Sequence, residues 1–261
     1  MRNRGLISVL LTVTCCVLLS ACIDRDKYAP KPYKRALEIV KLSDNNYMHI
    51  SYLKDGKGGY IGCNGYIYIS DNEAIVFDTA VDTILSNQLI DFIQLELKAS
   101  IKGVVVSHSH VDASGGLKSF ENSKISSYAS AKTAAILAKD SLFITHPFEV
   151  KQEIAVGKEV VLNQYFGEAI SPDNIVSYIP ASKTIVGSCM IKALDDVEGN
   201  LTDANLENWS DTVVKVKTAY PDAKHVIPGH GGYGDMSLLD NTIAMFAKYQ
   251  IEEETPQLNL E

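Results

Sequence analysis

After residue 35, hydrophobic and polar residues recur with the spacings of short strands and amphipathic helices. Runs rich in Val, Ile and Tyr, bounded by turn residues, predict strands. From Thr83 to Lys98, apolar residues such as Leu85, Leu89 and Ile93 share one helical face, which predicts a helix. The segment Ile101–Val106 that follows is a short apolar run suited to a buried strand.

The same patterns place the remaining elements. Strands are predicted at Leu37–Leu42, Tyr47–Leu53, Tyr66–Ser70, Ala74–Asp78, Ile154–Leu162, Asn174–Ile179, Thr184–Val186 and His225–Ile227, and helices at Ser130–Lys139, Ala204–Ala219 and Ser237–Tyr249. Strands interspersed with helices on a chain of 261 residues favour one α/β domain in which helices cover sheets. With 46% hydrophobic and 21% charged residues, the chain can build a substantial core.

The net charge restricts the possible partners. The formal charge is −8, and without the two arginines of the first 21 residues the rest of the chain carries −10. Proteins that bind nucleic acid need clustered cations to neutralise phosphates, so this balance argues against a nucleic-acid partner. Nothing in the sequence indicates an oligomeric state.

The N-terminus has the composition of an export signal. Arg2 and Arg4 precede the apolar run Leu6–Leu19, which is short for a membrane-spanning helix. The stretch Leu19–Cys22 resembles the bacterial lipobox, in which the cysteine is acylated and becomes the first residue after cleavage. A lipid on Cys22 would anchor the protein without a spanning segment, and a plain transmembrane anchor is the competing interpretation.

This signal implies a division of the chain and a location. Residues 1–21 are predicted to be a lipoprotein signal peptide, residues 22–35 a tether and residues 36–261 the folded domain. The protein is expected to be periplasmic and membrane-anchored. Of the five cysteines only Cys63 and Cys189 remain in the domain, and an oxidising compartment would permit a disulfide between them.

The strongest chemical signal follows the strand predicted at 101–106. His108, His110 and Asp112 stand within five residues and are followed by Ala-Ser-Gly-Gly. Imidazole nitrogen and carboxylate oxygen are both good zinc ligands, and side chains just past a strand end can converge on a metal. Ordinary polar loop residues are the alternative interpretation, but this trio is rare in loops.

Two later strand ends carry further candidate ligands. Cys189 follows an apolar strand, and a thiolate is a strong, soft ligand for zinc. His230 lies among glycines at the end of another predicted strand. Each of these signals alone is weak, because a buried free cysteine is the commoner case. Together with the histidine-rich stretch they indicate a zinc site.

At this point the chain resembles the class B metallo-β-lactamases along essentially its whole mature length. The most similar subclass has a three-histidine zinc site beside an Asp-Cys-His zinc site. The resemblance implies a four-layered αβ/βα sandwich, the metallo-β-lactamase fold, with the site at one edge between two sheets. It is carried by HSHVDASGG from His108, SPDNIVSYIP from Ser171, IVGSCMIK from Ile185, GNLTDANLENW from Gly199 and YPDAKHVIPGHGGYGD from Tyr220.

The resemblance implies roles for individual residues. Asp112, Cys189 and His230 match the Asp-Cys-His zinc site, and His108 and His110 match two ligands of the three-histidine site. This donor set implies zinc as the cofactor.

The resemblance also implies substrate contacts. Lys192 matches the lysine that pairs with the substrate carboxylate, as its charge would suit. Asn200 matches the asparagine that polarises the lactam carbonyl, and the glycine-rich loop Lys54–Asn64 matches the mobile flap over the substrate. A solvated surface pair is the alternative interpretation for Lys192 and Asn200.

One position departs from the family pattern. The third histidine of the family directly precedes the stretch that matches SPDN, and here that position is Ile170. Isoleucine has no lone pair, so the first site is reduced to two histidines, short of the three protein ligands typical of catalytic zinc. Glu168 is near enough in sequence for its carboxylate to be considered as a replacement. The remaining histidines, His49, His146 and His225, are predicted to be structural.

These observations lead to a functional expectation with two alternatives. We expect one tightly held zinc on Asp112, Cys189 and His230, with a second held weakly by His108 and His110 at high metal. Water activated by the metal would open a β-lactam amide, with Asp112 and Asn200 as catalytic residues. The alternatives are a zinc hydrolase of another amide or ester and a catalytically inactive zinc-binding lipoprotein. Lys192 and Asn200 favour the first interpretation, and Ile170 favours the alternatives.

Overall fold

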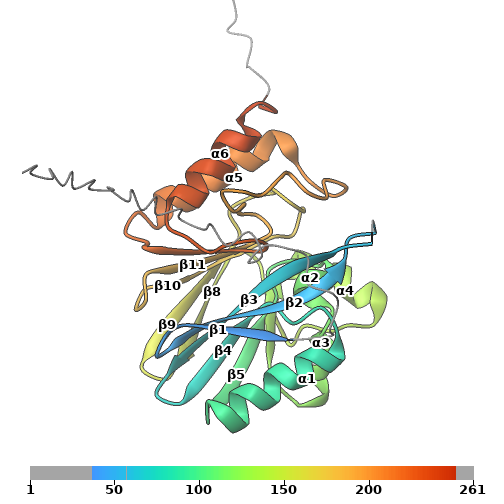
Figure 1. Cartoon of the computed structure of the whole chain (residues 1–261), viewed down its shortest axis with the longest axis vertical. Helices are drawn as coiled ribbons and strands as arrows, with labels where there is room; N and C mark the ends of the chain where they lie inside the picture. Colours follow the sequence, from blue (N-terminus) through green and yellow to red (C-terminus); the bar gives the residue numbers. More distant parts are fainter. Residues whose placement is uncertain (1–36, 57, 251–261) are drawn as a thin grey trace, which may run out of the picture. The chain divides into compact units, whose positions relative to one another are not determined.

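The computed structural model describes residues 37–56 and 58–250, shown in Figure 1. The predicted signal peptide, the predicted lipid site at Cys22 and the predicted tether lie outside the described residues. Among the helices of the described part, none combines the length and the apolar composition needed to cross a membrane.

Seven strands form the first sheet, side by side in the order in which they follow one another along the chain. Strands β1 to β4 pair antiparallel, whereas β5, β6 and β7 each run parallel to the strand before. Most of the predicted flap belongs to the hairpin of β2 and β3, which pair as far as Lys54 and Tyr60. The strands are β1 (Glu38–Ser43), β2 (Asn46–Lys54), β3 (Tyr60–Ser70), β4 (Glu73–Phe77), β5 (Ser100–Val105), β6 (Ser127–Ser130) and β7 (His146–Phe148).

Five strands form the second sheet, in the order β12, β11, β10, β9, β8. Here β11 and β12 run parallel, and the other neighbours are antiparallel. The single strand predicted over Ile154–Leu162 is wrong, because the chain turns back at Gly157. This residue has a φ of 57°, in the left-handed region that glycine adopts without a steric cost. The strands are β8 (Lys151–Val156), β9 (Glu159–Gln164), β10 (Val176–Ile179), β11 (Thr184–Ser188) and β12 (His225–Pro228).

All four predicted helices are present, whereas the short helices α2 and α3 were not predicted. The predicted helix from Thr83 is present as α1, continued by one π-helical segment, η2, and it begins where the Asp82 side chain accepts a hydrogen bond from the amide of Leu85. Helices α2 and α3 and strands β6 and β7 have three to six residues, too few to show a period in the sequence. The helices are α1 (Thr83–Asp91), η2 (Phe92–Glu96), α2 (Val111–Ser114), α3 (Leu117–Asn122), α4 (Ala131–Leu137), η3 (Ala138–Asp140), α5 (Leu206–Ala219) and α6 (Ser237–Ala247).

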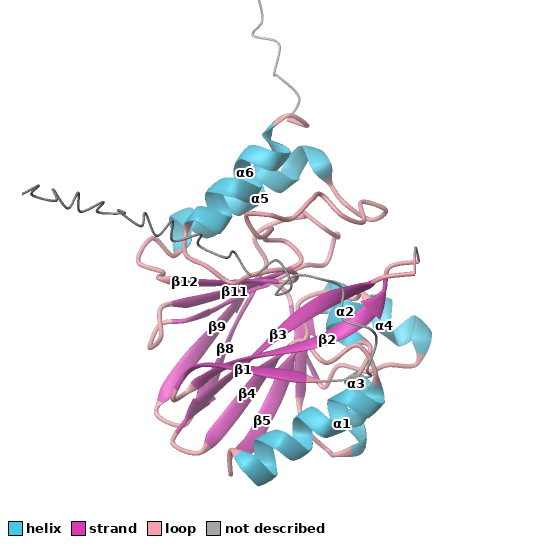
Figure 2. Cartoon of the chain, in the orientation of Figure 1, coloured by secondary structure: helices cyan, strands magenta, loops and turns pink. Residues whose placement is uncertain are grey.

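Three apolar clusters define the layers. One cluster joins the first sheet to α1 and α3, and a second, which contains Trp209 and Phe246, joins the second sheet to α5 and α6. The third brings Ile75 and Phe77 of the first sheet against Val186 and Ile227 of the second. Figure 2 shows α5 and α6 against one sheet and α1 and α3 along the other. The predicted four-layered αβ/βα sandwich is therefore confirmed.

Candidate metal centre

The predicted metal ligands lie on three segments of the chain, each of which directly follows a strand. His108 and His110 follow β5, and Asp112 lies in the first turn of α2. Cys189 directly follows β11, and His230 lies two residues after β12. Because β11 and β12 are parallel neighbours, their carboxyl ends deliver these two residues to the same edge of the second sheet.

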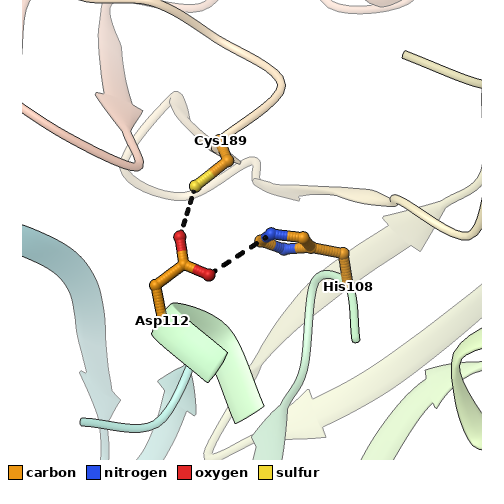
Figure 3. Close-up of side chains that lie close together, drawn as sticks. All are labelled: His108, Asp112 and Cys189. Carbon is orange, nitrogen blue, oxygen red and sulfur yellow. Dashed lines mark hydrogen bonds and ion pairs between the residues drawn. The ribbon is translucent and has the colours of Figure 1, made fainter. Parts of the chain in front are cut away.

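The structure brings four of these side chains together. Cys189 Sγ lies 2.7 Å from Asp112 Oδ2 and 3.3 Å from His230 Nε2, and that nitrogen is 3.4 Å from Asp112 Oδ2. The other carboxylate oxygen of Asp112 faces His108 Nε2 at 3.6 Å. Figure 3 shows the Asp112 carboxylate between the thiol and the His108 imidazole. We call Asp112, Cys189 and His230 the cysteine site.

Two imidazoles are oriented by their second ring nitrogen. His230 Nδ1 donates to the carbonyl of Gly62 at 2.8 Å, which leaves the lone pair of Nε2 for the cysteine site. His108 Nδ1 lies 2.9 Å from Ser107 Oγ, while its buried Nε2 has no hydrogen-bond partner among the described residues. An unpaired buried nitrogen is costly unless something binds it. Together with the carboxylate and the thiol beside it, this nitrogen fits a zinc ion.

Burial and close packing shift the protonation of the site. Burial alone would raise the pKa of Asp112, but His108, His230 and Cys189 hold it well below its usual range. Burial, reinforced by the Asp112 carboxylate, raises the pKa of the Cys189 thiol well above its usual value. Burial alone would lower the pKa of His230, but Asp112 and Cys63 raise it to about 10. The metal-free site therefore retains protons that a bound cation would displace.

A buried carboxylate that the sequence analysis did not single out supports both ligand loops. Asp78 Oδ1 accepts the Ser107 amide at 2.7 Å, and Oδ2 accepts the hydroxyls of Ser107 at 2.9 Å and Ser188 at 2.7 Å. These serines directly precede His108 and Cys189. Burial raises the pKa of Asp78 to about 7 against the opposing effect of these hydrogen bonds. The available signal was its position directly after an apolar strand, which it shares with the predicted ligands.

The other predicted site lacks its third ligand. The rings of His108 and His110, which we call the histidine pair, lie 4.8 Å apart, and His110 Nε2 is 2.9 Å from Asp203 Oδ2. Ile170 is only 4% exposed and belongs to the apolar cluster that contains Trp209. Ile170, which the resemblance aligns with a third histidine, is thus part of the hydrophobic core.

Glu168 is engaged elsewhere. Its Oε2 accepts a hydrogen bond from Asn205 Nδ2 at 2.9 Å, and its Oε1 lies 3.5 Å from Lys132 Nζ. Because both carboxylate oxygens have partners, a replacement role at the histidine pair would require breaking these contacts.

The other three histidines of the chain also stand apart from the metal ligands. His49 is buried in β2 with its Nε2 at 3.2 Å from the carbonyl oxygen of Asp78. His146 stacks on Tyr128 at the edge of the first sheet, and His225 is an exposed residue at the start of β12.

The two predicted substrate residues differ in exposure. Lys192 is only 3% exposed, and its Nζ lies 5.3 Å from the centre of the Trp209 ring. Its positive charge opposes the rise in the pKa of the Cys189 thiol that burial causes. Asn200 is exposed, and its Oδ1 accepts hydrogen bonds from the amide and the hydroxyl of Thr202 at 3.1 and 2.7 Å. The remaining hydrogen-bonding capacity of the Asn200 amide is therefore that of a donor.

Comparison with known proteins matches this arrangement to one family. The model of the metallo-beta-lactamase superfamily matches residues 58–230, which include all the predicted ligands. Among curated relatives, the metallo-beta-lactamase type 2 of Bacteroides fragilis is 29% identical over 215 residues, which are 82% of this chain and 86% of that protein. The metallo-beta-lactamase type 2 of Pseudomonas aeruginosa is 31% identical over 208 residues, which are 79% of this chain and 82% of that protein.

The structural comparison agrees. A metallo-beta-lactamase from Pseudomonas aeruginosa, solved in its mono-zinc form, superposes with a TM-score of 0.78 and is 25% identical, covering 85% of this chain and 99% of that one. Fold, site and family model therefore lead to one conclusion: the chain belongs to the metallo-beta-lactamase superfamily.

Proposed function

We propose that the chain is a zinc-dependent β-lactam hydrolase that works with one zinc, held by the cysteine site. The observation that carries this proposal is the convergence of Asp112, Cys189 and His230, whose ligand atoms lie 2.7 to 3.4 Å apart. A carboxylate, a thiolate and an imidazole are a sufficient zinc donor set. The relatives named as metallo-beta-lactamases support the substrate class.

The chemistry is divided between the metal and the side chains. When bound, zinc supplies the Lewis acidity that makes water a nucleophile near neutral pH. The unpaired Nε2 of His108 faces the Asp112 carboxylate at 3.6 Å, so either group can take a proton from an attacking water. Asn200 donates to the lactam carbonyl, and the Lys192 ammonium attracts the substrate carboxylate.

The same site permits a second function, namely zinc binding without lactam turnover or with turnover of another amide or ester. Ile170 favours this alternative, because its buried side chain has no donor atom that could complete a second zinc site. Lys192 favours the same alternative. Its side chain is only 3% exposed, whereas a lactam hydrolase would need this ammonium to be accessible to the substrate carboxylate.

The deciding experiment is hydrolysis of a chromogenic cephalosporin and a carbapenem by the full chain, with zinc counted per molecule. We expect turnover at about one zinc per chain, and loss of turnover in Cys189→Ala. A matched control is Ser141→Ala, which changes an exposed residue away from the ligand loops. Tight zinc with no lactam turnover would overturn the proposal, and a panel of esters and linear amides would then separate the two alternatives.

We also propose that the protein is exported and held at a membrane through a lipid on Cys22, as the lipobox resemblance implies. Incorporation of labelled palmitate into the full chain, and its loss in Cys22→Ser, tests this. Labelling that survives in Cys22→Ser would contradict it.

A further inference from the structure

A second thiol lies beside the cysteine site. Cys63 in β3 is 2% exposed, and its thiol donates a long hydrogen bond to the Ile61 carbonyl, with Sγ 3.6 Å from the oxygen. Its side chain packs against a small apolar cluster that includes Ala80 and Leu85. Apolar packing accounts for the burial of the thiol, but not for its contact with the His230 ring.

Strand β3 is fastened to the loop that carries His230, on both sides of Cys63. The carbonyl of Gly62 accepts the hydrogen bond from His230 Nδ1 at 2.8 Å. The Asn64 amide donates to the Gly229 carbonyl at 2.8 Å, and the Asn64 side chain donates to the Gly231 carbonyl at 2.9 Å. These bonds fix the backbone of Cys63 next to the metal-binding loop.

The Cys63 thiol itself interacts with the His230 ring, and Asp112 and Cys189 act on it electrostatically. Burial is the main reason that the pKa of the Cys63 thiol is raised, with the His230 ring opposing this shift. Gly229 allows the Cys189 and His230 loops to approach each other, because a Cβ at this glycine would lie 2.6 Å from Cys189 Sγ. The Cys63 thiol thus contacts one residue of the cysteine site, His230, and lies within electrostatic reach of the other two.

We propose that Cys63 is a fourth protein ligand of the metal at the cysteine site, which makes the donor set Asp112, Cys189, His230 and Cys63. Zinc sites with three protein ligands keep a position for water, whereas sites with four are closed. Two thiolates would also favour soft cations such as Zn²⁺ and Cd²⁺ over Mg²⁺. The consequence is tight metal binding, with an open position only when the Cys63 thiolate leaves the metal.

This inference rests on the proposed function only in that the cysteine site holds zinc. The test uses the full chain loaded with Co²⁺, whose thiolate-to-metal charge-transfer absorption grows with the number of bound thiolates. Cys15, Cys16 and Cys22 are replaced by serine in every sample, so that only Cys63 and Cys189 contribute. A reductant keeps both thiols free, as they are in the structure.

We expect two thiolates per metal in the reference protein, and about half the charge-transfer intensity in Cys63→Ser and in Cys189→Ser. Zinc affinity in Cys63→Ser should fall by at least about 10-fold, the lower end of what even an outer partner of a metal ligand is worth. Cys63→Ala serves as the matched variant without a hydroxyl, and thermal melting of the metal-free proteins checks the fold.

The outcomes separate this inference from the proposed function. If Cys189→Ser lowers the intensity and Cys63→Ser leaves intensity and affinity unchanged, the inference is wrong while the zinc site stands. If neither substitution changes the spectrum, the cysteine site itself is wrong. Two thiolates per metal without lactam turnover would support the inference and contradict the proposed hydrolase.

Discussion

The cysteine site and the histidine pair occupy the same edge of the fold but differ in their surroundings. At the cysteine site each ligand touches the next, and the His230 ring is held from behind by the Gly62 carbonyl. At the histidine pair, His110 turns its Nε2 to Asp203, and Ile170, which the resemblance aligns with a third histidine, is buried in an apolar cluster. The cysteine site thus gathers three potential ligands in mutual contact, whereas the histidine pair offers two imidazoles.

The two sites share the support of Asp78 but differ in the other segments that they use. The cysteine site is built from β3, α2 and the ends of β11 and β12, whereas Ile170 lies in the segment between β9 and β10. Ile170 is buried in the apolar cluster that contains Trp209 and is not part of any of these supports. A change at either site should act on metal binding there first.

The largest expected effect is that of Cys189→Ala. It removes the thiolate from the complete site and leaves Asp112 next to His230 without the soft donor that zinc prefers. Zinc affinity should fall by at least about 100-fold, the upper end of what outer-sphere changes cost. Competition with a chromogenic chelator measures this, and unchanged affinity would show that the metal is held elsewhere.

Asp78→Asn should come next, because Asp78 supports both sites through Ser107 and Ser188. An amide can accept fewer of these three hydrogen bonds, so we expect zinc affinity to fall on the order of 10-fold. The control is Asp71→Asn, at an exposed turn between β3 and β4. An effect as small as that of the control would contradict the supporting role.

Asp78→Asn should also change how the stability of the metal-free protein depends on pH. The pKa of Asp78 is raised from 3.8 to about 7, so the metal-free folded state holds a proton that the unfolded chain has lost in that window. The contribution of Asp78 to stability is therefore present at low pH and is lost as the pH rises from about 4 to about 7. Melting of chelator-treated protein should show this loss in the wild type and less of it in Asp78→Asn.

Ile170→His tests whether this one residue accounts for the difference in metal binding between the cysteine site and the histidine pair. An imidazole in this buried position should destabilise the metal-free protein by roughly 1–3 kcal/mol, the cost of a buried polar group without a partner. Added zinc should reverse the loss and raise the stoichiometry toward two per chain. Ile170→Leu is the apolar control, and a variant that stays at one zinc would mean that the histidine pair is unsuitable for other reasons.

His110→Ala should have the smallest effect. Its Nε2 is 2.9 Å from Asp203, an exposed partner, and among the described residues no hydrogen bond or ion pair joins the His110 side chain to the cysteine site. We expect zinc affinity to change by less than about 3-fold, within the range of exposed charged pairs. A loss comparable to that of Cys189→Ala would erase the distinction between the two sites.

Much of the fold could be predicted from the sequence. The long helices show a clear period, because one face of each is buried. Strands such as β4, β10 and β11 are short apolar runs, because both of their faces are buried. The reversal at Gly157 was missed, since apolar residues stand close on both sides of it, at Ile154–Val156 and at Val160–Leu162. The short helix α2, which carries Asp112, has four residues and shows no period at all.

The sequence by itself determined the identity of the predicted ligands, because His108, His110 and Asp112 lie within five residues and Cys189 and His230 each follow an apolar strand. Only the tertiary structure decided how they are supported. Asp78 and Ser188 are 110 positions apart, and Cys63 meets the His230 loop across more than 160 positions. Contacts of this kind leave no local pattern, because they arise from the packing of two sheets rather than from neighbouring residues.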